Sequence, residues 1–195
     1  MYTVSTSNTA EKIAVAAQTV LVSEGVRAVT MRRVADMVGV SPMATYKHYP
    51  SRQALLDAVA ERAFRELAEG WGTRVTGGSW EDRAFGLMED FLDFALGRPH
   101  LYGFLMTERR PQARRFPDGF EDGGSPFSML VVLVEEGMRE GLLRKDDPLE
   151  VTLALTSSVQ GLVQLYLGGR IGLEEDGFRG LCERTARRIF DGIRE

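Results

Sequence analysis

Residues 30–52, TMRRVADMVGVSPMATYKHYPSR, carry two short helical patterns separated by a glycine. Thr30 is a suitable N-cap for the first helix, and Gly39 is a suitable residue to end it. The second helix begins at Ser41-Pro42, a capping hydroxyl followed by proline at the first helical position, where no amide hydrogen is missed. It ends at about residue 48, because Pro50 disfavours a helical residue before it. The stretch therefore predicts a helix-turn-helix.

The two-helix layout of this stretch suits contact with duplex DNA. A glycine relieves backbone strain at the tight turn, and the small side chain of Ala35 lets the two helices approach closely. The second helix of such a pair can lie in the major groove with its N-terminal residues at the base edges. The hydroxyl of Ser41 and the free amides at the helix start also suit a phosphate.

Helical periodicity extends along almost the whole chain, and no segment shows a convincing strand alternation. Residues 109–125 are polar and rich in proline and glycine, which predicts a loop. The fold class is therefore all-α. The expected helices cover residues 9–24, 30–38, 41–48, 51–69, 79–97, 100–107, 126–140, 148–168 and 174–193.

The composition is that of an ordinary folded protein, with 195 residues of which 44% are hydrophobic and 27% charged. One cysteine, Cys182, and two histidines are too few soft ligands for a structural zinc site, so we expect neither a metal nor a cofactor. The uncharged stretch Val151–Gly169 approaches the length of a membrane span, but its threonine, serine and glutamine residues favour a helix buried against protein. No export signal is recognisable at the start, so we expect a cytoplasmic protein without membrane contact.

The charge is distributed unevenly, although the net value is only −4. Residues 1–55 hold six basic and three acidic residues, a surplus of +3. The remaining residues hold 18 basic and 25 acidic ones, which gives −7. A polyanionic partner is therefore expected for the N-terminal part only.

Four motifs in this order and spacing resemble the TetR family of transcriptional regulators, over about residues 9–65. The motifs are Thr30-Met31-Arg32-Arg33-Val34-Ala35, Gly39-Val40-Ser41, Tyr46-Lys47-His48-Tyr49 and Ser51-Arg52-Gln53-Ala54-Leu55-Leu56. The resemblance implies a three-helix DNA-binding domain at residues 1–50 and a helical ligand-binding and dimerisation bundle at residues 51–195, with residues 51–69 as the connecting helix. Thr45 departs from the family pattern, in which an apolar residue is more usual.

The resemblance also implies which residues contact DNA. Thr30 and Ser41 would contact phosphates, although both would cap their helices without DNA as well. Three further residues match positions that grip the DNA backbone: Tyr46, His48 and Arg52. Four residues would face the bases, with Lys47 as the main hydrogen-bonding reader: Pro42, Met43, Ala44 and Lys47. Arg32 and Arg33 are further candidates, which a solvated helix face explains equally well.

Two more sets of residues follow from the resemblance. An apolar effector pocket would be lined by some of the aromatic and aliphatic residues that a bundle core would also use, with one polar group: Phe64, Met88, Phe91, Phe104, Met129, Leu133 and Gln160. A homodimer would form through the last two long helices, which offer more apolar surface than one small bundle needs: Leu155, Val159, Leu162, Val163, Tyr166, Leu181 and Ile189.

The expected function is that of a repressor that binds a palindromic operator as a homodimer and is released by a small, mostly apolar effector. An enzyme is disfavoured, because the sequence lacks a nucleophile elbow, a P-loop, a dinucleotide fingerprint and metal-ligand spacing; no catalytic residue is proposed. A helical protein-interaction module with a non-functional DNA-binding part is the alternative, and it predicts no salt-dependent binding to duplex DNA.

Overall fold

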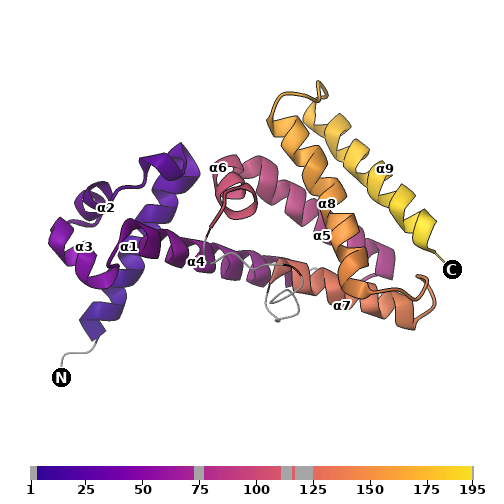
Figure 1. The fold of residues 1–195 in the computed structure, drawn as a ribbon, viewed down its shortest axis with the longest axis horizontal. Coiled ribbons are helices and arrows are strands. Elements are labelled where there is room, and N and C mark those ends of the chain that lie inside the picture. Colours follow the sequence, from indigo (N-terminus) through magenta and orange to yellow (C-terminus); the bar gives the residue numbers. More distant parts are fainter. Residues whose placement is uncertain (1–3, 73–76, 111–115, 117–124, 195) are drawn as a thin grey trace. The chain divides into compact units, whose positions relative to one another are not determined.

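The computed structural model describes residues 4–72, 77–110, 116 and 125–194, without the side chains of residues 4–8 and 72. In these ranges the regular elements are helices, which confirms the all-α prediction (Figure 1). They are α1 (Val4–Glu24), η1 (Val26–Ala28), α2 (Met31–Val38), α3 (Pro42–His48), α4 (Arg52–Gly72), α5 (Trp80–Gly97), α6 (Pro99–Tyr102), η2 (Gly103–Thr107), α7 (Pro126–Arg139), α8 (Pro148–Leu167) and α9 (Glu175–Ile193). Most of the loop predicted at residues 109–125 lies outside the described residues.

The helix starts follow the capping residues of the sequence. The Thr30 hydroxyl accepts a hydrogen bond from the Arg33 amide at 3.2 Å, and the Ser41 hydroxyl accepts one from the Ala44 amide at 3.2 Å. At α8 the Asp147 carboxylate accepts hydrogen bonds from the amides of the second and third helical residues. Each side chain thus binds an amide that has no partner within its own helix.

The expected start of α1 at Thr9 is wrong, because the helix begins at Val4. Residues 4–8 contain neither glycine nor proline, so nothing in them stops the helix from extending towards the N-terminus. The helix α4 likewise continues through Gly70 to Gly72, beyond the predicted end at residue 69.

The chain divides into two compact units, which are described separately. The head unit consists of residues 1–64 and 98–113, and the bundle unit of residues 65–97 and 114–195. The sequence placed a domain boundary at residue 50, whereas this division runs through α4 and assigns α6 to the head unit. The reason lies in the buried face of α4, whose first half belongs to the core of the head unit. That core includes Ile13, Ala17, Leu21, Val29, Val34, Leu55, Val59 and Leu101.

The bundle unit is built from α5, α7, α8 and α9, of which α8 and α9 lie side by side and antiparallel (Figure 1). Trp80 anchors its core: the indole Nε1 donates a hydrogen bond to the Leu133 carbonyl at 2.7 Å, and the ring meets Phe190 edge-on at 5.2 Å between centroids. Cys182 is fully buried, and burial raises the pKa of its thiol to about 11. No described helix combines the length and the hydropathy that crossing a membrane requires.

Gly137 on α7 packs directly against Trp80, which generates a stability prediction. A Cβ at Gly137 would lie 2.9 Å from Trp80 Nε1 and 3.0 Å from Leu143 Cδ1. We expect Gly137→Ala to destabilise the fold by about 1–3 kcal/mol, because overpacking outweighs the better helix propensity of alanine. Gly86→Ala on α5, where a Cβ meets no atom within 4 Å, should instead stabilise by about 0.5–1 kcal/mol. Denaturant unfolding monitored by circular dichroism measures both; equal shifts would contradict the assigned packing.

Candidate nucleic-acid interface

The turn between α2 and α3 depends on a left-handed backbone conformation at Gly39 and is held by two backbone hydrogen bonds. Gly39 has φ 73° and ψ 33°, a conformation that glycine adopts without steric cost. The Gly39 amide donates to the Asp36 carbonyl, and the Val40 amide donates to the Ala35 carbonyl at 3.0 Å. Val34 and Ala35 are fully buried beneath the turn. This geometry is a helix-turn-helix, as the sequence predicted.

The helix α3 has one buried and one exposed side. Thr45 is fully buried, whereas 70% of Met43 and 47% of Tyr46 remain accessible. Pro42 and Lys47 are exposed as well. Ala44 and His48 are half-buried. Of the four residues predicted at the bases, Pro42, Met43 and Lys47 are thus exposed and Ala44 is half-buried. The opposite side of the helix is fixed in the core by Thr45.

Arg33, one of the predicted DNA contacts, is bound within the head unit. Its guanidinium forms a two-pronged ion pair with Glu24 at the end of α1, in which Nη1 lies 2.8 Å from Oε2. The hydrogen bonds from Arg33 hold the pKa of the Glu24 carboxyl below its usual value. Arg33 is thus held by an ion pair although 41% of its side chain stays accessible, and Arg32, its neighbour on α2, is exposed.

Arg52 links the start of α4 to the connection between α1 and α2. Its Nε donates to the Val29 carbonyl at 2.7 Å, and one Nη donates to the Val26 carbonyl. The role of Arg52 at the DNA backbone stays a prediction, and the structure adds a positioning role that the sequence analysis missed. The two carbonyls lie more than 20 residues away in the chain, so no local pattern could have indicated them.

Tyr49 is a second positioning residue that the sequence analysis missed. Its hydroxyl donates a hydrogen bond to the Ala10 carbonyl of α1 at 3.1 Å, and burial raises the pKa of the phenol. The end of α3 is therefore tied to α1.

The predicted pocket residues are divided between the two units. Phe64 and Phe104 belong to the head unit, and the others belong to the bundle unit: Met88, Phe91, Met129, Leu133 and Gln160. Phe104 and Leu133 are buried, whereas the remaining five are half-buried. Burial of Leu133 in the apolar cluster around Trp80 favours a core role for that residue.

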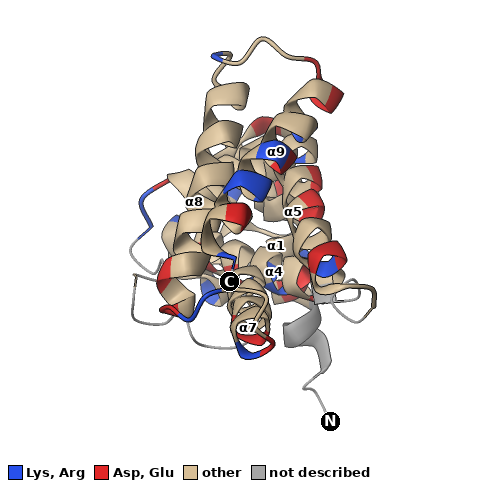
Figure 2. Ribbon diagram, turned by 90° about the vertical axis from the view of Figure 1, so that its right-hand side faces the viewer, with Lys and Arg blue, Asp and Glu red and all other residues tan. Residues whose placement is uncertain are grey.

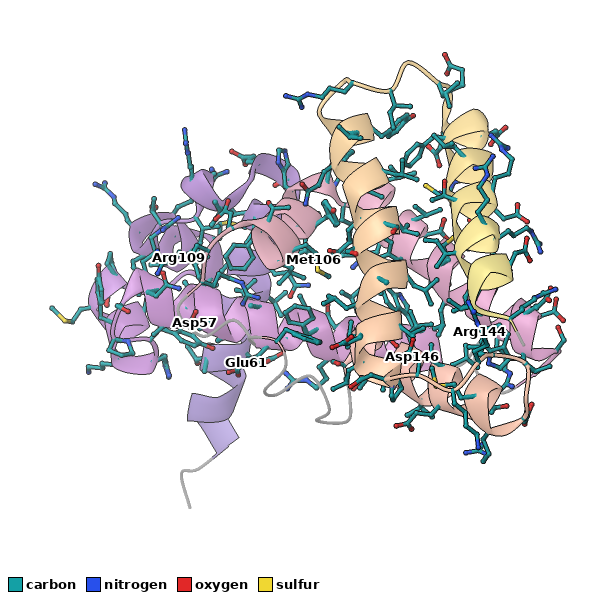
Figure 3. The ribbon with its side chains drawn as sticks, turned by 45° about the vertical axis from the view of Figure 1, so that its right-hand side comes forward. Asp57, Glu61, Met106, Arg109, Arg144 and Asp146 are labelled. Atoms are coloured by element: carbon teal, nitrogen blue, oxygen red, sulfur yellow. The ribbon has the colours of Figure 1, made fainter. Side chains whose placement is uncertain are left out.

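Arg110 joins the two pocket residues of the head unit. Its guanidinium carbon lies 5.6 Å from the ring centre of Phe64 and 5.4 Å from that of Phe104, within cation–π distance. Burial lowers the pKa of this guanidinium, and the carboxylate of Asp57 opposes the shift. Asp57 lies on α4 (Figure 3). Sequence analysis missed Arg110, because the polar segment that begins at Arg109 predicted only a loop.

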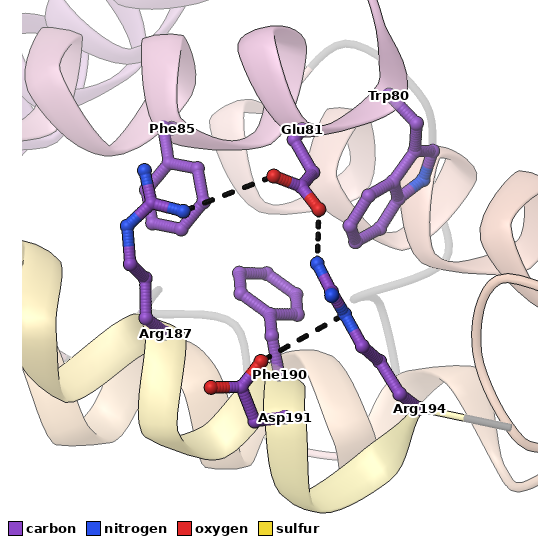
Figure 4. Close-up of a pocket in the computed structure, with 7 residues that line it drawn as sticks. All are labelled: Trp80, Glu81, Phe85, Arg187, Phe190, Asp191 and Arg194. Atoms are coloured by element: carbon purple, nitrogen blue, oxygen red, sulfur yellow. Dashed lines mark hydrogen bonds and ion pairs between the residues drawn. The ribbon is translucent and has the colours of Figure 1, made fainter.

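A small surface pocket lies between α5 and α9 and contains none of the predicted pocket residues (Figure 4). Its walls include the rings of Trp80, Phe85 and Phe190. Arg187 stacks over the Phe85 ring at 4.3 Å, and Arg194 pairs with Glu81. The charged side chains of this pocket thus pair with one another.

The predicted dimer residues fall into two groups. Leu155, Val159 and Val163 are buried within the single chain, so they pack against its own core. The others are half-buried: Leu162, Tyr166, Leu181 and Ile189. The outward side of α8 is formed by different residues, with Ala154, Ser157, Gly161, Gln164 and Leu165 all exposed. Figure 2 shows α8 almost without charge, in contrast to α9 and α5.

Comparison with known proteins assigns the family. The model for "Tetracyclin repressor-like, C-terminal domain" matches residues 84–189, and that for "Bacterial regulatory proteins, tetR family" matches residues 13–59. The chain belongs to the TetR family. Within the described residues, no cluster of three or more potential metal ligands accompanies this regulator fold.

Solved structures share the fold of this TetR-family regulator. A protein of unknown function from Rhodococcus sp. RHA1 is 24% identical with a TM-score of 0.80, and 96% of each chain is covered. NalD, the secondary repressor of the MexAB-OprM multidrug efflux pump in Pseudomonas aeruginosa, is 18% identical with a TM-score of 0.62 over 97% of each chain. RolR in complex with the ligand resorcinol is 18% identical with a TM-score of 0.66, over 97% of this chain and 89% of that one. No curated protein sequence matches the chain.

Thr45 beneath the exposed side of α3 generates the second prediction. Its hydroxyl is buried, and none of the described residues offers it a hydrogen-bond partner. We expect Thr45→Val to stabilise the fold by about 1 kcal/mol, because it removes an unsatisfied polar group and keeps the shape. Thr156→Val is the matched control, since the Thr156 hydroxyl donates to the Thr152 carbonyl at 2.8 Å. The melting temperatures of both variants test this prediction. A loss of stability on Thr45→Val would contradict the assignment of the Thr45 hydroxyl as an unsatisfied polar group.

Proposed function

We propose that this TetR-family regulator is a repressor that binds a palindromic DNA operator as a homodimer and is released by a small, mostly apolar effector. The observation that carries the DNA-binding part is the exposed side of α3, which lies opposite the fully buried Thr45 and follows the turn made by the left-handed Gly39. A helix fixed in this way can present its side chains to the major groove.

The dimer part of the proposal rests on α8. From Val151 to Gly169 the chain carries no charge, although Ala154, Gly161 and Leu165 on this helix are exposed. An uncharged, small-residue face allows close approach of a second helix. A two-fold axis through such an interface would give two recognition helices and a two-fold operator.

Release by an effector would be a population shift. A ligand among the predicted pocket residues would favour a conformation whose recognition helices no longer match the spacing of the operator. The helix α4 is the natural lever, because its residues belong partly to the head unit and partly to the bundle unit. Half-buried side chains of the bundle unit such as Met88 and Phe91 suit an apolar ligand, and the structural relative RolR binds resorcinol.

Selection of bound duplexes from a random pool at near-physiological salt tests the proposal. Enrichment of a two-fold palindrome is the expected result, with an affinity that falls steeply as salt rises. A folded dimer that enriches no sequence would instead support the helical protein-interaction module.

Lys47 is the residue with which base contacts can be tested. We expect Lys47→Ala to weaken binding to the selected operator by about 1–3 kcal/mol and binding to random DNA by much less. Lys145→Ala, which removes an exposed lysine of the bundle unit, is the control and should change neither. Fluorescence anisotropy measures the dissociation constants for the selected operator and for random DNA. Equal losses on the two duplexes would make Lys47 a phosphate contact.

Gly161 permits a test of the dimer surface without damage to the fold. A Cβ at Gly161 meets no atom of the chain within 4 Å, so Gly161→Glu adds a charge to the face without an internal clash. We expect it to raise the dimer dissociation constant at least 100-fold, since an unpaired charge at a buried interface costs about 3–5 kcal/mol. Gly97→Glu, at another exposed glycine with free space, should leave the dimer intact. Light scattering after size exclusion measures the mass; a dimeric Gly161→Glu variant would exclude α8 from the interface.

A further inference from the structure

The accessible side of α3 holds few groups that can form hydrogen bonds with bases. The residues from Pro42 to His48 include no arginine, asparagine, glutamine or acidic residue. Arginine makes bidentate bonds to guanine, asparagine and glutamine make them to adenine, and an acidic residue accepts a hydrogen bond from N4 of cytosine. Lys47 is a point charge with three donors and no fixed fork. Hydrogen bonding from the cationic side chains of α3 to the bases therefore depends on Lys47.

The same side of α3 is apolar at the positions nearest its start. Met43 is 70% exposed, the most exposed of the large hydrophobic side chains in the described residues. Its neighbours Pro42 and Ala44 add only aliphatic surface. Because most of the Met43 side chain is in contact with water, its apolar surface adds little to the stability of the head unit. That surface contributes favourable free energy only when a partner covers it.

Of the arginines closest to α3 in sequence, Arg32 lies on α2 as a candidate phosphate contact, and Arg33 and Arg52 are engaged in internal bonds. The guanidinium of Arg33 is paired with Glu24, and that of Arg52 is bonded to the carbonyls of Val26 and Val29. Both side chains would have to give up internal bonds before they could reach a base edge.

We infer that the exposed side of α3 recognises the 5-methyl groups of thymines in each operator half-site, with Met43 as the contact that determines this specificity. The inference rests on the proposed function and deepens it. In the major groove thymine is the unmodified base that presents a methyl group, and apolar side chains are its natural partners. Half-sites with thymine opposite Met43 and Ala44 follow from this chemistry. Lys47 would contact an acceptor such as guanine O6 or N7 beside them.

Replacement of thymine by uracil tests the inference, because uracil keeps the base pairing and the O4 acceptor and lacks only the methyl group. Duplexes of the selected operator with single deoxyuridines are compared by anisotropy. We expect about a fourfold loss of affinity for each critical methyl removed, the factor for one methylene-sized apolar group returned to water. An operator insensitive to uracil at every position would overturn the inference and leave the proposed function standing.

Met43→Ala supplies the second arm. On the thymine operator this variant should bind at least fourfold more weakly than the unchanged protein. On the uracil operator the two proteins should bind within twofold of each other, because the side-chain change and the base change remove the same contact. Met37→Ala, which truncates a 50% exposed methionine on α2, is the matched control and should keep the full uracil effect. Independent, additive losses for Met43→Ala and uracil would overturn the inference. Failure to enrich any operator would overturn it together with the proposed function.

Discussion

The shortness of α3 is the constraint on which the interface depends. A helix of seven residues is too short to persist in water on its own, so its conformation comes from its neighbours. Three contacts fix the conformation of α3: the Ser41 cap at its start, the packing of the buried Thr45 at its centre and the Tyr49 hydrogen bond to α1 after its end. The exposed side of α3 is consequently as well positioned as the core beneath it.

Local features of the chain could be predicted and distant ones could not. The ends of α2 and the start of α3 follow from Thr30, Gly39 and Ser41, because capping acts over three or four residues. The ion pair of Arg33 joins residues nine apart, and the bonds of Arg52 span more than 20. Such partners depend on how helices pack, which periodicity does not reveal. Periodicity alone also could not tell which apolar residues of α8 face the chain's own core.

Two of the six basic residues in residues 1–55 are held by internal hydrogen bonds. The surplus of +3 in residues 1–55 counts Arg33 and Arg52, whose guanidinium groups are used in internal bonds. Such bonds make the arginines part of the framework that holds α1, α2 and α4 together. The net charge is unchanged by these bonds, because Glu24 is already subtracted in the +3 and Arg52 keeps its charge beside the two carbonyls. What the bonds restrict is the position of the two guanidinium groups.

The burial of Cys182 has a practical consequence. A thiol with a pKa of about 11 is almost entirely protonated at neutral pH, and only the thiolate attacks alkylating reagents. Because the Cys182 side chain is also fully buried, we expect the native chain to react only slowly with maleimide dyes. A single cysteine introduced at an exposed position of the head unit would be the one reactive thiol, so a fluorophore could be attached there without first replacing Cys182. Distances between the labelled subunits of the proposed dimer could then be followed in solution while a candidate effector is added.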